Sequence, residues 1–234
     1  MIIANDVIPA TFLERENKFL VTARLENGTG IQAFLADPGR LKELLQPFSK
    51  VYLVRAGNPK RKTTFDMVAI EYRNLIVSVD TRVPNRYVRM LLDDNYLFAD
   101  KFDSVRPEYP YKDSRIDFLA WRGDTKFLIE VKSVTLVENG VALFPDAPTK
   151  RGTRHVRELT NCRVDGFEPV LVFVIQRPDP TSFRPNDATD PDFAAALVEA
   201  KHEHVTITAF TNNTFIDEQD KLVMEPLAPV PLDF

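Results

Sequence analysis

Two carboxylates and a lysine within one predicted β-hairpin are the residues of this chain best suited to chemistry. Asp117 lies in a strand-like segment, and Glu130 and Lys132 lie in the strand-like segment that follows it. Gly123 and Asp124 lie midway between the two, and a glycine at the first central position is typical of a type II′ hairpin turn. The sequence therefore predicts two antiparallel strands, at 114–121 and 126–133.

The predicted turn also fixes which residues face each other, because side chains alternate between the two faces of a strand. One face of the hairpin is then wholly apolar, with the pairs Ala120–Phe127, Phe118–Ile129 and Ile116–Val131. The other face has the pairs Leu119–Leu128, Asp117–Glu130 and Arg115–Lys132. A shift of one residue would destroy this separation, so the pattern itself supports the pairing.

Opposed carboxylates in this position need a cation between them. Directly opposed residues have Cβ atoms about 5 Å apart, and like charges so placed repel each other. Hard divalent cations such as Mg²⁺ or Mn²⁺ take one or two carboxylates and keep waters, which leaves positions for a phosphate oxygen and an attacking water. Lys132, on the same face as Glu130, can neutralise charge on the phosphate or orient that water. These residue types suit hydrolysis of a phosphodiester.

A purely structural interpretation of the same residues stands beside the catalytic one. Glu-x-Lys is common on solvated faces of strands, where the ion pair contributes about 0–1 kcal/mol to stability. Arg115, Asp117, Glu130 and Lys132 could also form a network of four ion-paired side chains without any metal. The position of Asp117 opposite Glu130 is the feature that favours a site.

Composition argues against a membrane-spanning protein, a secreted protein and a structural zinc site. The chain has 234 residues, of which 44% are hydrophobic and 27% charged, and its longest apolar run, 170–175, is too short to span a membrane. The first residues lack the features of a secretory signal, so we expect a cytoplasmic protein. One cysteine and three histidines are too few for a structural zinc site, so any metal must be bound by oxygen.

Charge is unevenly distributed along the chain. The net charge is −4, but residues 179–234 alone carry 3 basic and 11 acidic side chains. This acidic last quarter masks a remainder that is neutral to basic and therefore compatible with a nucleic-acid partner. Dinucleotide-binding, Walker-type and Gly-x-Ser-x-Gly motifs are absent from the sequence, so it offers no support for nucleotide hydrolysis or serine esterase chemistry.

The first third of the chain is predicted to form a small β-barrel. Strand-like segments separated by turn residues are expected at 19–25, 31–35, 51–55, 65–72 and 75–79. Five such strands favour a barrel of the OB type, and an SH3-like barrel fits the periodicity nearly as well. We assign residues 1–82 to this barrel and residues 83–234 to a second domain.

The second domain is expected to be α/β. Helices are predicted at about 86–98, 150–164 and 191–202, and strands other than the hairpin at 140–144, 169–176 and 204–210. The apolar strand at 169–176 has helices before and after it, which is typical of a strand buried on both faces of a sheet. The segment between residues 177 and 191 is expected to be a long loop.

Three blocks of sequence around the predicted site resemble one family. They are Ser114–Phe118, Ile129–Leu136 and Phe144–Leu159. Over nearly its whole length the chain is similar to the sugar fermentation stimulation protein (SfsA) family. The resemblance implies an OB-fold domain followed by a restriction-endonuclease-like α/β domain of the PD-(D/E)xK nuclease superfamily. It also implies a protein that binds DNA, with a role in regulating sugar metabolism.

The resemblance assigns roles to individual residues of the hairpin. Asp117, Glu130 and Lys132 fall on the catalytic positions of the superfamily. The expected metal ligands are Asp117, Glu130 and the carbonyl of Val131.

This sequence departs from the family pattern at two places. Many members have a glutamate on the helix that opens the second domain, where this chain has Met90. Asp93 or Asp94, one turn later, could replace that glutamate or could simply lie on a solvated face. In the first domain, Asp37-Pro38-Gly39 stands where the family commonly has Asn-Thr-Gly.

Basic residues in two segments are candidates for phosphate contacts. The helix at 150–164 is strongly basic, and residues 60–62 form a basic run in a loop between two barrel strands. Basic side chains and the amides of a helix N-terminus can both contact phosphates. A solvated basic face and a simple turn explain the two segments equally well. If DNA binds, the residues expected to contact it are Arg40, Lys60, Arg61, Lys62, Lys150, Arg151 and Arg154.

We therefore predict a divalent-metal-dependent DNA phosphodiesterase with low sequence specificity. Arg151 and His155 can assist the reaction, although a helical histidine beside a carboxylate is more often an oriented structural partner. The alternative is a non-catalytic DNA-binding regulator of sugar (maltose) metabolism genes. We expect DNA as the partner, Mg²⁺ or Mn²⁺ as the cofactor, no membrane and no small-molecule cofactor. The oligomeric state, a dimer included, is left open.

Overall fold

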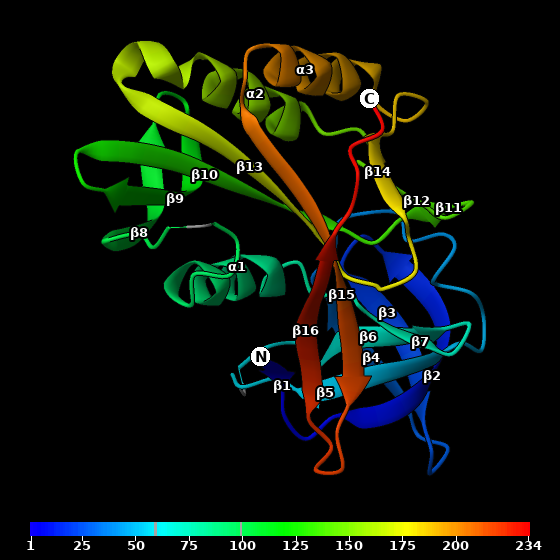
Figure 1. The fold of residues 1–234 in the computed structure, drawn as a ribbon. Coiled ribbons are helices and arrows are strands. Elements are labelled where there is room, and N and C mark those ends of the chain that lie inside the picture. Colours follow the sequence, from blue (N-terminus) through cyan, green and yellow to red (C-terminus); the bar gives the residue numbers. More distant parts are fainter. Residues whose placement is uncertain (59, 99) are drawn as a thin grey trace.

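The computed structural model of the protein describes residues 1–58, 60–98 and 100–234 and contains two large sheets. The first sheet lies in the N-terminal part, in blue and cyan in Figure 1, and the second carries helices on both of its faces. The prediction of a barrel followed by an α/β domain is confirmed.

The N-terminal sheet is a closed barrel with one additional strand. Its order is β4-β3-β2-β5-β6-β7, and parallel pairing of β4 with β6 closes the five strands β2 to β6. Small and aliphatic side chains fill its interior, including the fully buried Val21, Ala23, Leu35, Leu53 and Met67. The strands are β2 (Ile8–Asn17), β3 (Leu20–Leu25), β4 (Gly30–Leu35), β5 (Lys50–Arg55), β6 (Phe65–Tyr72) and β7 (Leu75–Ser78).

One of the five barrel strands differs from the sequence prediction. The sequence does not predict strand β2, whereas β7, one of the five predicted strands, is a hairpin extension of β6. The register of β2 against β3 shifts between Phe12 and Glu14 and again between Arg15 and Asn17. These bulges interrupt the alternation by which a strand is recognised in sequence, because each extra residue moves the following side chains to the other face.

The C-terminal part is built on a seven-stranded mixed sheet of order β1-β16-β15-β13-β10-β9-β8. The central strands β10, β13 and β15 are parallel, and β13 is buried along most of its length, as the apolar pattern predicts. The strands are β1 (Ile2–Ala4), β8 (Ser104–Tyr111), β9 (Ser114–Arg122), β10 (Thr125–Val134), β13 (Phe167–Ile175), β15 (Thr206–Ile216) and β16 (Leu222–Pro229).

Three α-helices cover this sheet. Helix α1 (Val83–Asp93) packs on one face, and α2 (Lys150–Thr160) and α3 (Pro191–His202) pack together on the other (Figure 1). Helix α1 begins three residues earlier than predicted, because Pro84 lies in its first turn, where the missing N–H of proline costs nothing. A 3₁₀ turn (Asn161–Asp165) continues α2. None of the described helices is long and apolar enough to cross a membrane.

A small three-stranded sheet lies beside the large one. It consists of β11 (Val137–Glu138), β12 (Val141–Phe144) and β14 (Ser182–Pro185). The segment 177–191, expected to be a loop, therefore contains a short strand that pairs in parallel with β12. The connection from β10 through β11 and β12 leads directly into α2, so this sheet positions the N-terminus of that helix.

The two parts of the chain are interleaved at their junction. The N-terminal strand β1, within the range 1–82 assigned to the barrel, pairs with β16 of the second sheet. The long strand β15 continues past its pairing with β13, remains paired with β16 and contacts β7 of the barrel. Figure 1 shows β15 and β16 running alongside the barrel. The barrel loops are thereby held against the end of the second sheet where β10 ends.

Candidate active site

The hairpin of β9 and β10 has the predicted register over the five pairs nearest its turn. The ladder runs from the pair Arg122–Thr125 to the pair Phe118–Ile129. The predicted pairs Asp117–Glu130 and Arg115–Lys132 lie beyond the end of this ladder. Gly123 has a φ of +56°, a positive value that a type II′ turn requires at its first central residue.

The two strands part beyond the pair Phe118–Ile129. The predicted apolar pair Ile116–Val131 is wrong, because Val131 packs in the core cluster under α1 whereas Ile116 packs in the cluster under α2 and α3. The reason is that the regular ladder ends at Phe118 and does not include Asp117. Beyond this end, alternation along one strand no longer determines which face the residues of the other strand occupy. The candidate site lies at this point of divergence.

Asp117 bridges the gap between the parting strands. Its Oδ2 atom accepts a hydrogen bond of 2.8 Å from the backbone N–H of Val131, in place of a carbonyl of the ladder. Its Oδ1 atom accepts a hydrogen bond of 2.6 Å from the side-chain amide of Asn85, on α1. Burial and then the nearby charge of Glu130 raise the pKa of Asp117 to about 6, and Lys132 with the two hydrogen bonds offsets this only in part.

Glu130 is the most enclosed carboxylate of the site, with 2% of its surface exposed. Its Oε1 atom accepts a hydrogen bond of 2.5 Å from Lys132 Nζ and lies 2.6 Å from Nδ1 of His155. Burial alone would raise the pKa of Glu130, but Lys132 and His155 outweigh it and lower the pKa to about 2. The Oε2 atom is buried and has no hydrogen-bond partner among the described residues.

His155 and Arg151 reach the site from the first turns of α2. The Thr149 hydroxyl caps this helix by accepting a hydrogen bond of 3.0 Å from the N–H of Gly152. A Cβ atom at position 152 would lie 2.8 Å from Thr149 Cγ2, so glycine permits this close cap. The cap fixes the start of the helix and with it the position of His155, which is 3% exposed.

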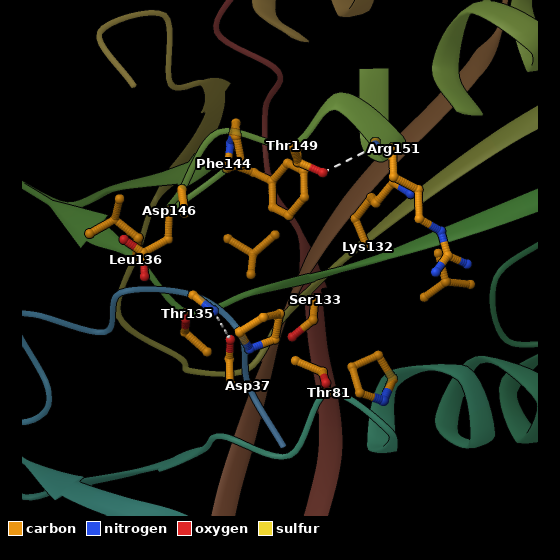
Figure 2. Close-up of a pocket in the computed structure, with 18 of the residues that line it drawn as sticks. Asp37, Thr81, Lys132, Ser133, Thr135, Leu136, Phe144, Asp146, Thr149 and Arg151 are labelled. Carbon is orange, nitrogen blue, oxygen red and sulfur yellow. Dashed lines mark hydrogen bonds between the residues drawn. The ribbon is translucent and has the colours of Figure 1, made fainter. Parts of the chain in front are cut away.

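A cleft of about 420 Å³ contains the candidate site and lies between the two domains. The second domain contributes Asp117, Glu130, Lys132, Arg151 and His155 to its lining, and the first domain contributes Lys18 and Asp37. In Figure 2, Lys132 and Arg151 lie near each other at one end of the cleft, and Asp146 lies at the other. The structure thus brings together all of the predicted catalytic and assisting residues.

The proposed network of four ion-paired side chains is not formed. Arg115 is exposed and pairs with Glu108 at 3.5 Å, on the side of β9 toward β8. Of the four side chains in that alternative, only Lys132 and Glu130 make an ion pair with each other. The Asp117 carboxylate is held by hydrogen-bond donors without charge.

The position of Met90 is not part of the site. Met90 packs against the core cluster beneath α1, and Asp93 makes an exposed ion pair of 2.9 Å with Arg89. Asp93 therefore does not replace the missing glutamate. The residue of α1 that contacts Asp117 is Asn85, which donates to it rather than adding a third carboxylate.

The predicted DNA-contacting residues are spread over the surface. Of the described side chains in this set, Arg151 alone lines the cleft. Lys150 and Arg154 lie in a separate hollow on the outer side of α2, and Arg40, Lys60 and Lys62 are exposed on the barrel. Arg61 is half-buried and makes an ion pair of 2.7 Å with Asp66.

Sequence reasoning missed the residues that the first domain and α1 contribute to the cleft. They include Lys18, Asp37, Thr81 and Asn85. One of them carried a signal, because Asp37 lies in the Asp37-Pro38-Gly39 segment, which departs from the family pattern. It could not be assigned to the site, because its proximity to Asp117 depends on how the two domains pack.

The donor set of the site fits one type of metal ion. In the described part of the chain no group of three or more His, Cys, Asp and Glu side chains is arranged to hold a metal. Two carboxylates close together, one with an unpartnered buried oxygen, suit a hard divalent cation that takes one or two carboxylates and keeps several waters. They do not suit structural zinc, which needs four protein ligands.

The fold and the site together define the class of protein. A closed five-stranded barrel is joined to a mixed sheet that carries Asp117 on one strand and Glu130-x-Lys132 on the next, the arrangement of an OB domain followed by a restriction-endonuclease-like domain. Residues 13–79 match the model described as "SfsA N-terminal OB domain", and residues 82–218 match "Sugar fermentation stimulation protein RE domain". The chain belongs to the sugar fermentation stimulation protein family.

Individual relatives are similar over most of their length. The sugar fermentation stimulation protein homolog of Moorella thermoacetica is 43% identical over 96% of each chain. The homolog of Ruminiclostridium cellulolyticum is 40% identical over 85% of this chain and 87% of its own. A solved structure, described as Pyrococcus furiosus SfsA in complex with Ca²⁺, is similar with a TM-score of 0.86 and 25% identity over 99% of this chain and 97% of that one.

Proposed function

We propose that the protein is a divalent-metal-dependent DNA phosphodiesterase whose active site is the cleft between its two domains. The observation that carries the proposal is the buried, unpartnered Oε2 atom of Glu130 beside the Asp117 carboxylate. An unpaired buried carboxylate oxygen costs free energy, and a bound cation would recover it. The description of the Pyrococcus furiosus relative as a complex with Ca²⁺ supports a cation-binding role for the family.

Asp117, Glu130 and the carbonyl of Val131 would hold the metal. When bound, Mg²⁺ or Mn²⁺ lowers the pKa of a coordinated water and neutralises charge that develops on the phosphate. The Val131 amide and Asn85 fix the Asp117 carboxylate, and His155 and Lys132 fix that of Glu130. Both carboxylates are therefore oriented before a cation binds, which is the condition for electrostatic catalysis.

Lys132 would contact the scissile phosphate. Its Nζ atom is 2.5 Å from Glu130 Oε1, and its side chain is 11% exposed, at the floor of the cleft. An ammonium group there can neutralise a phosphate oxygen or orient the attacking water. In the reaction the water oxygen bonds to phosphorus, one P–O ester bond breaks, and one proton is released at neutral pH for each bond cleaved.

Dispersed basic residues support binding with little sequence specificity. Arg40, Lys60, Lys62, Lys150 and Arg154 are exposed on both domains, so they can contact the backbone of a nucleic acid without reading bases. Binding of this kind weakens steeply with salt, by about one power of salt concentration for each phosphate contacted. Affinity for DNA is therefore expected to fall sharply between about 50 and 200 mM salt.

A cleavage assay tests the proposal. Wild type, Asp117→Ala and Lys132→Ala are incubated with single-stranded, duplex and branched DNA in Mg²⁺, Mn²⁺ or EDTA. We expect metal-dependent cleavage by the wild type, none in EDTA, and loss of cleavage in both variants. Circular dichroism checks that the variants are folded.

The same assay can refute the proposal. DNA binding without cleavage of any substrate, equal in all three proteins, would contradict a catalytic role and leave a non-catalytic DNA-binding protein as the better account. Cleavage that persists in Asp117→Ala would contradict the assignment of the site.

A further inference from the structure

Two phenylalanines form an exposed aromatic stack on the barrel. Phe19 lies in the turn between β2 and β3, and Phe34 lies on the outer face of β4. Their ring centroids are 6.0 Å apart and the rings are inclined by 22°, an offset-stacked arrangement. Phe19 remains 43% exposed, so the pair presents an aromatic surface to solvent.

Cationic side chains surround this stack. The Arg61 guanidinium lies 5.0 Å and that of Arg82 6.0 Å from the centroid of Phe34, and Lys18 Nζ lies 5.7 Å from the centroid of Phe19. Asp66 pairs with Arg61 at 2.7 Å and with Arg82 at 2.9 Å, and Asp80 pairs with Arg82 at 2.7 Å. We call Phe19, Phe34, Lys18, Arg61 and Arg82 the aromatic platform.

The platform reaches the cleft through Lys18. Lys18 lines the cleft, and Arg82 directly precedes α1, whose Asn85 contacts Asp117. The turn that carries Lys18 is held in place by Arg15, which donates a hydrogen bond of 2.7 Å to the Lys18 carbonyl. A chain that enters the cleft along this rim would therefore meet the platform at a fixed position.

Aromatic surfaces interleaved with cations match the chemistry of a single nucleic-acid strand. Unpaired bases stack on aromatic rings, and the phosphates between them are attracted to lysine and arginine. Bases in a duplex have no free face to offer, because each is stacked within the helix. The platform would therefore favour single-stranded over duplex DNA, whereas exposed basic residues alone would bind both.

We propose that the protein takes DNA with a single-stranded segment, and that bases of this segment stack on Phe19 at the entrance to the cleft. The inference rests on the proposed function, in that it names the form of DNA that reaches the phosphodiesterase site. The predicted basic run 60–62 then contributes through Arg61, whose place beside Phe34 is not visible in the sequence.

Phe48 is a matched control for the exposure of Phe19. Phe48 is 73% exposed on another loop of the barrel, and single exposed apolar residues are common on proteins. Neither an aromatic nor a cation–π contact to Phe48 is found within the described residues. If Phe19 were only an exposed apolar residue with no role in binding, its substitution would affect DNA binding no more than substitution of Phe48.

A binding experiment separates the two explanations. Fluorescence anisotropy measures binding of fluorescein-labelled dT20 and of a blunt hairpin duplex, in EDTA to prevent cleavage. We expect Phe19→Ala to bind dT20 about 5- to 150-fold more weakly than wild type, the equivalent of ~1–3 kcal/mol per stacked base. Duplex binding should be unchanged, Phe48→Ala should match wild type, and Phe19→Tyr, which keeps a ring, should retain affinity for dT20.

The outcomes of this experiment are independent of the catalytic assay. Equal binding of dT20 by Phe19→Ala, Phe48→Ala and wild type would overturn the platform, whatever the cleavage assay gives. A parallel loss of dT20 and duplex binding in Phe19→Ala would also overturn it. Undiminished cleavage by Asp117→Ala would refute the proposed function instead, and the anisotropy data would still decide whether single strands stack on Phe19.

Discussion

The Nδ1 atom of His155 lies 2.6 Å from Oε1 of Glu130, and both side chains are buried. On the opposite side of the ring, the Nε–H of Arg151 donates to Nε2 at 3.3 Å. A guanidinium group only donates, so Nε2 accepts and the ring hydrogen is on Nδ1. His155 therefore donates to Glu130 and holds it with Oε2 directed away from the ring nitrogen and without a partner.

Replacement of His155 is expected to weaken metal binding or slow cleavage, because His155 orients Glu130 and does not itself contact the substrate. His155→Ala should lower metal affinity or cleavage rate by about 10- to 100-fold, the usual effect of losing a group that orients a metal ligand. His155→Asn places an amide N–H close to the position of Nδ1 and should restore most of the rate. The measurement is Mn²⁺ affinity and cleavage rate for the three proteins.

The asparagine variant distinguishes positioning from packing. Both variants remove the ring from a buried position, so both should lose thermal stability. Rates that fall equally in the two variants, in step with stability, would mean that His155 acts only by filling space.

Asp37 is expected to make stability depend on pH. Burial, with a smaller contribution from the charge of Asp146, raises its pKa to about 6, although the Gly39 N–H and Arg15 oppose this. Between about pH 4 and pH 6 the folded protein keeps a proton that the unfolded chain has released. Stability should therefore fall as the pH rises through this range, by up to ~3 kcal/mol, and stay lower above it.

Asp37→Asn tests this dependence. Asparagine can still accept the 2.7 Å hydrogen bond from the Gly39 N–H at Oδ1, but carries no charge. Urea unfolding should show the variant to be more stable than wild type at pH 7.5 and nearly equal to it near pH 4. Asp124→Asn, in the exposed turn after Gly123, is the control. A difference that does not change with pH, or a less stable variant at pH 7.5, would refute the prediction.

Gly39 allows the barrel loop to approach the second domain. A Cβ atom at this position would lie 2.9 Å from Asp37 Oδ1 and 3.0 Å from Asp146 Oδ2. Neither oxygen can move freely, because the first accepts the N–H of Gly39 and the second accepts that of Leu41 at 2.6 Å. Gly39→Ala should therefore destabilise the protein by about 1–3 kcal/mol, as overpacking does.

Gly30 provides the matched control for that substitution. A Cβ atom there would meet nothing within 4 Å, so Gly30→Ala should be close to neutral. Differential scanning fluorimetry compares the two variants with wild type. Equal melting temperatures for Gly39→Ala and Gly30→Ala would show that the carboxylates of Asp37 and Asp146 leave room for a side chain at position 39.

The hairpin could be predicted from sequence because its determinants are local. Alternation along residues 114–131 and the glycine at position 123 fix the register through Phe118–Ile129, and that register places Asp117 near Glu130. The limit of the prediction is equally local. Alternation assumes a continuous ladder, and the strands part at Asp117, so the face on which Ile116 packs could not be derived.

Strands at the edges of the sheets carried little signal. Strand β8 contains Pro107 and Pro110 and is mostly exposed, and proline is tolerated there because one side of an edge strand has no partner. Strand β16 is not an edge strand, but β1 pairs with it only at Leu222 and Val223. Its second half contains two prolines and lacks alternation. Neither segment shows the periodicity by which a half-buried strand is recognised, so neither was predicted.

The parts of the site that come from other elements depend on tertiary packing. Asn85 reaches Asp117 because α1 covers the face of the sheet beneath β10, and Lys18 reaches the cleft because the barrel is held against the end of that sheet. On α2, Arg151 faces the cleft and Arg154 faces the outer hollow, although they are three residues apart. Charge and spacing alone could not separate these roles.

The central claim is that Asp117 and Glu130 together bind one divalent cation. Electron paramagnetic resonance of free Mn²⁺ measures this directly, by titration of wild type, Asp117→Asn and Glu130→Gln, with Asp93→Asn as a control at an exposed carboxylate of α1. We predict that wild type and Asp93→Asn bind Mn²⁺ with equal affinity, and that each of the other two variants binds at least about tenfold more weakly, a loss of ~1.4 kcal/mol or more. Equal Mn²⁺ affinity in all four proteins would contradict the account.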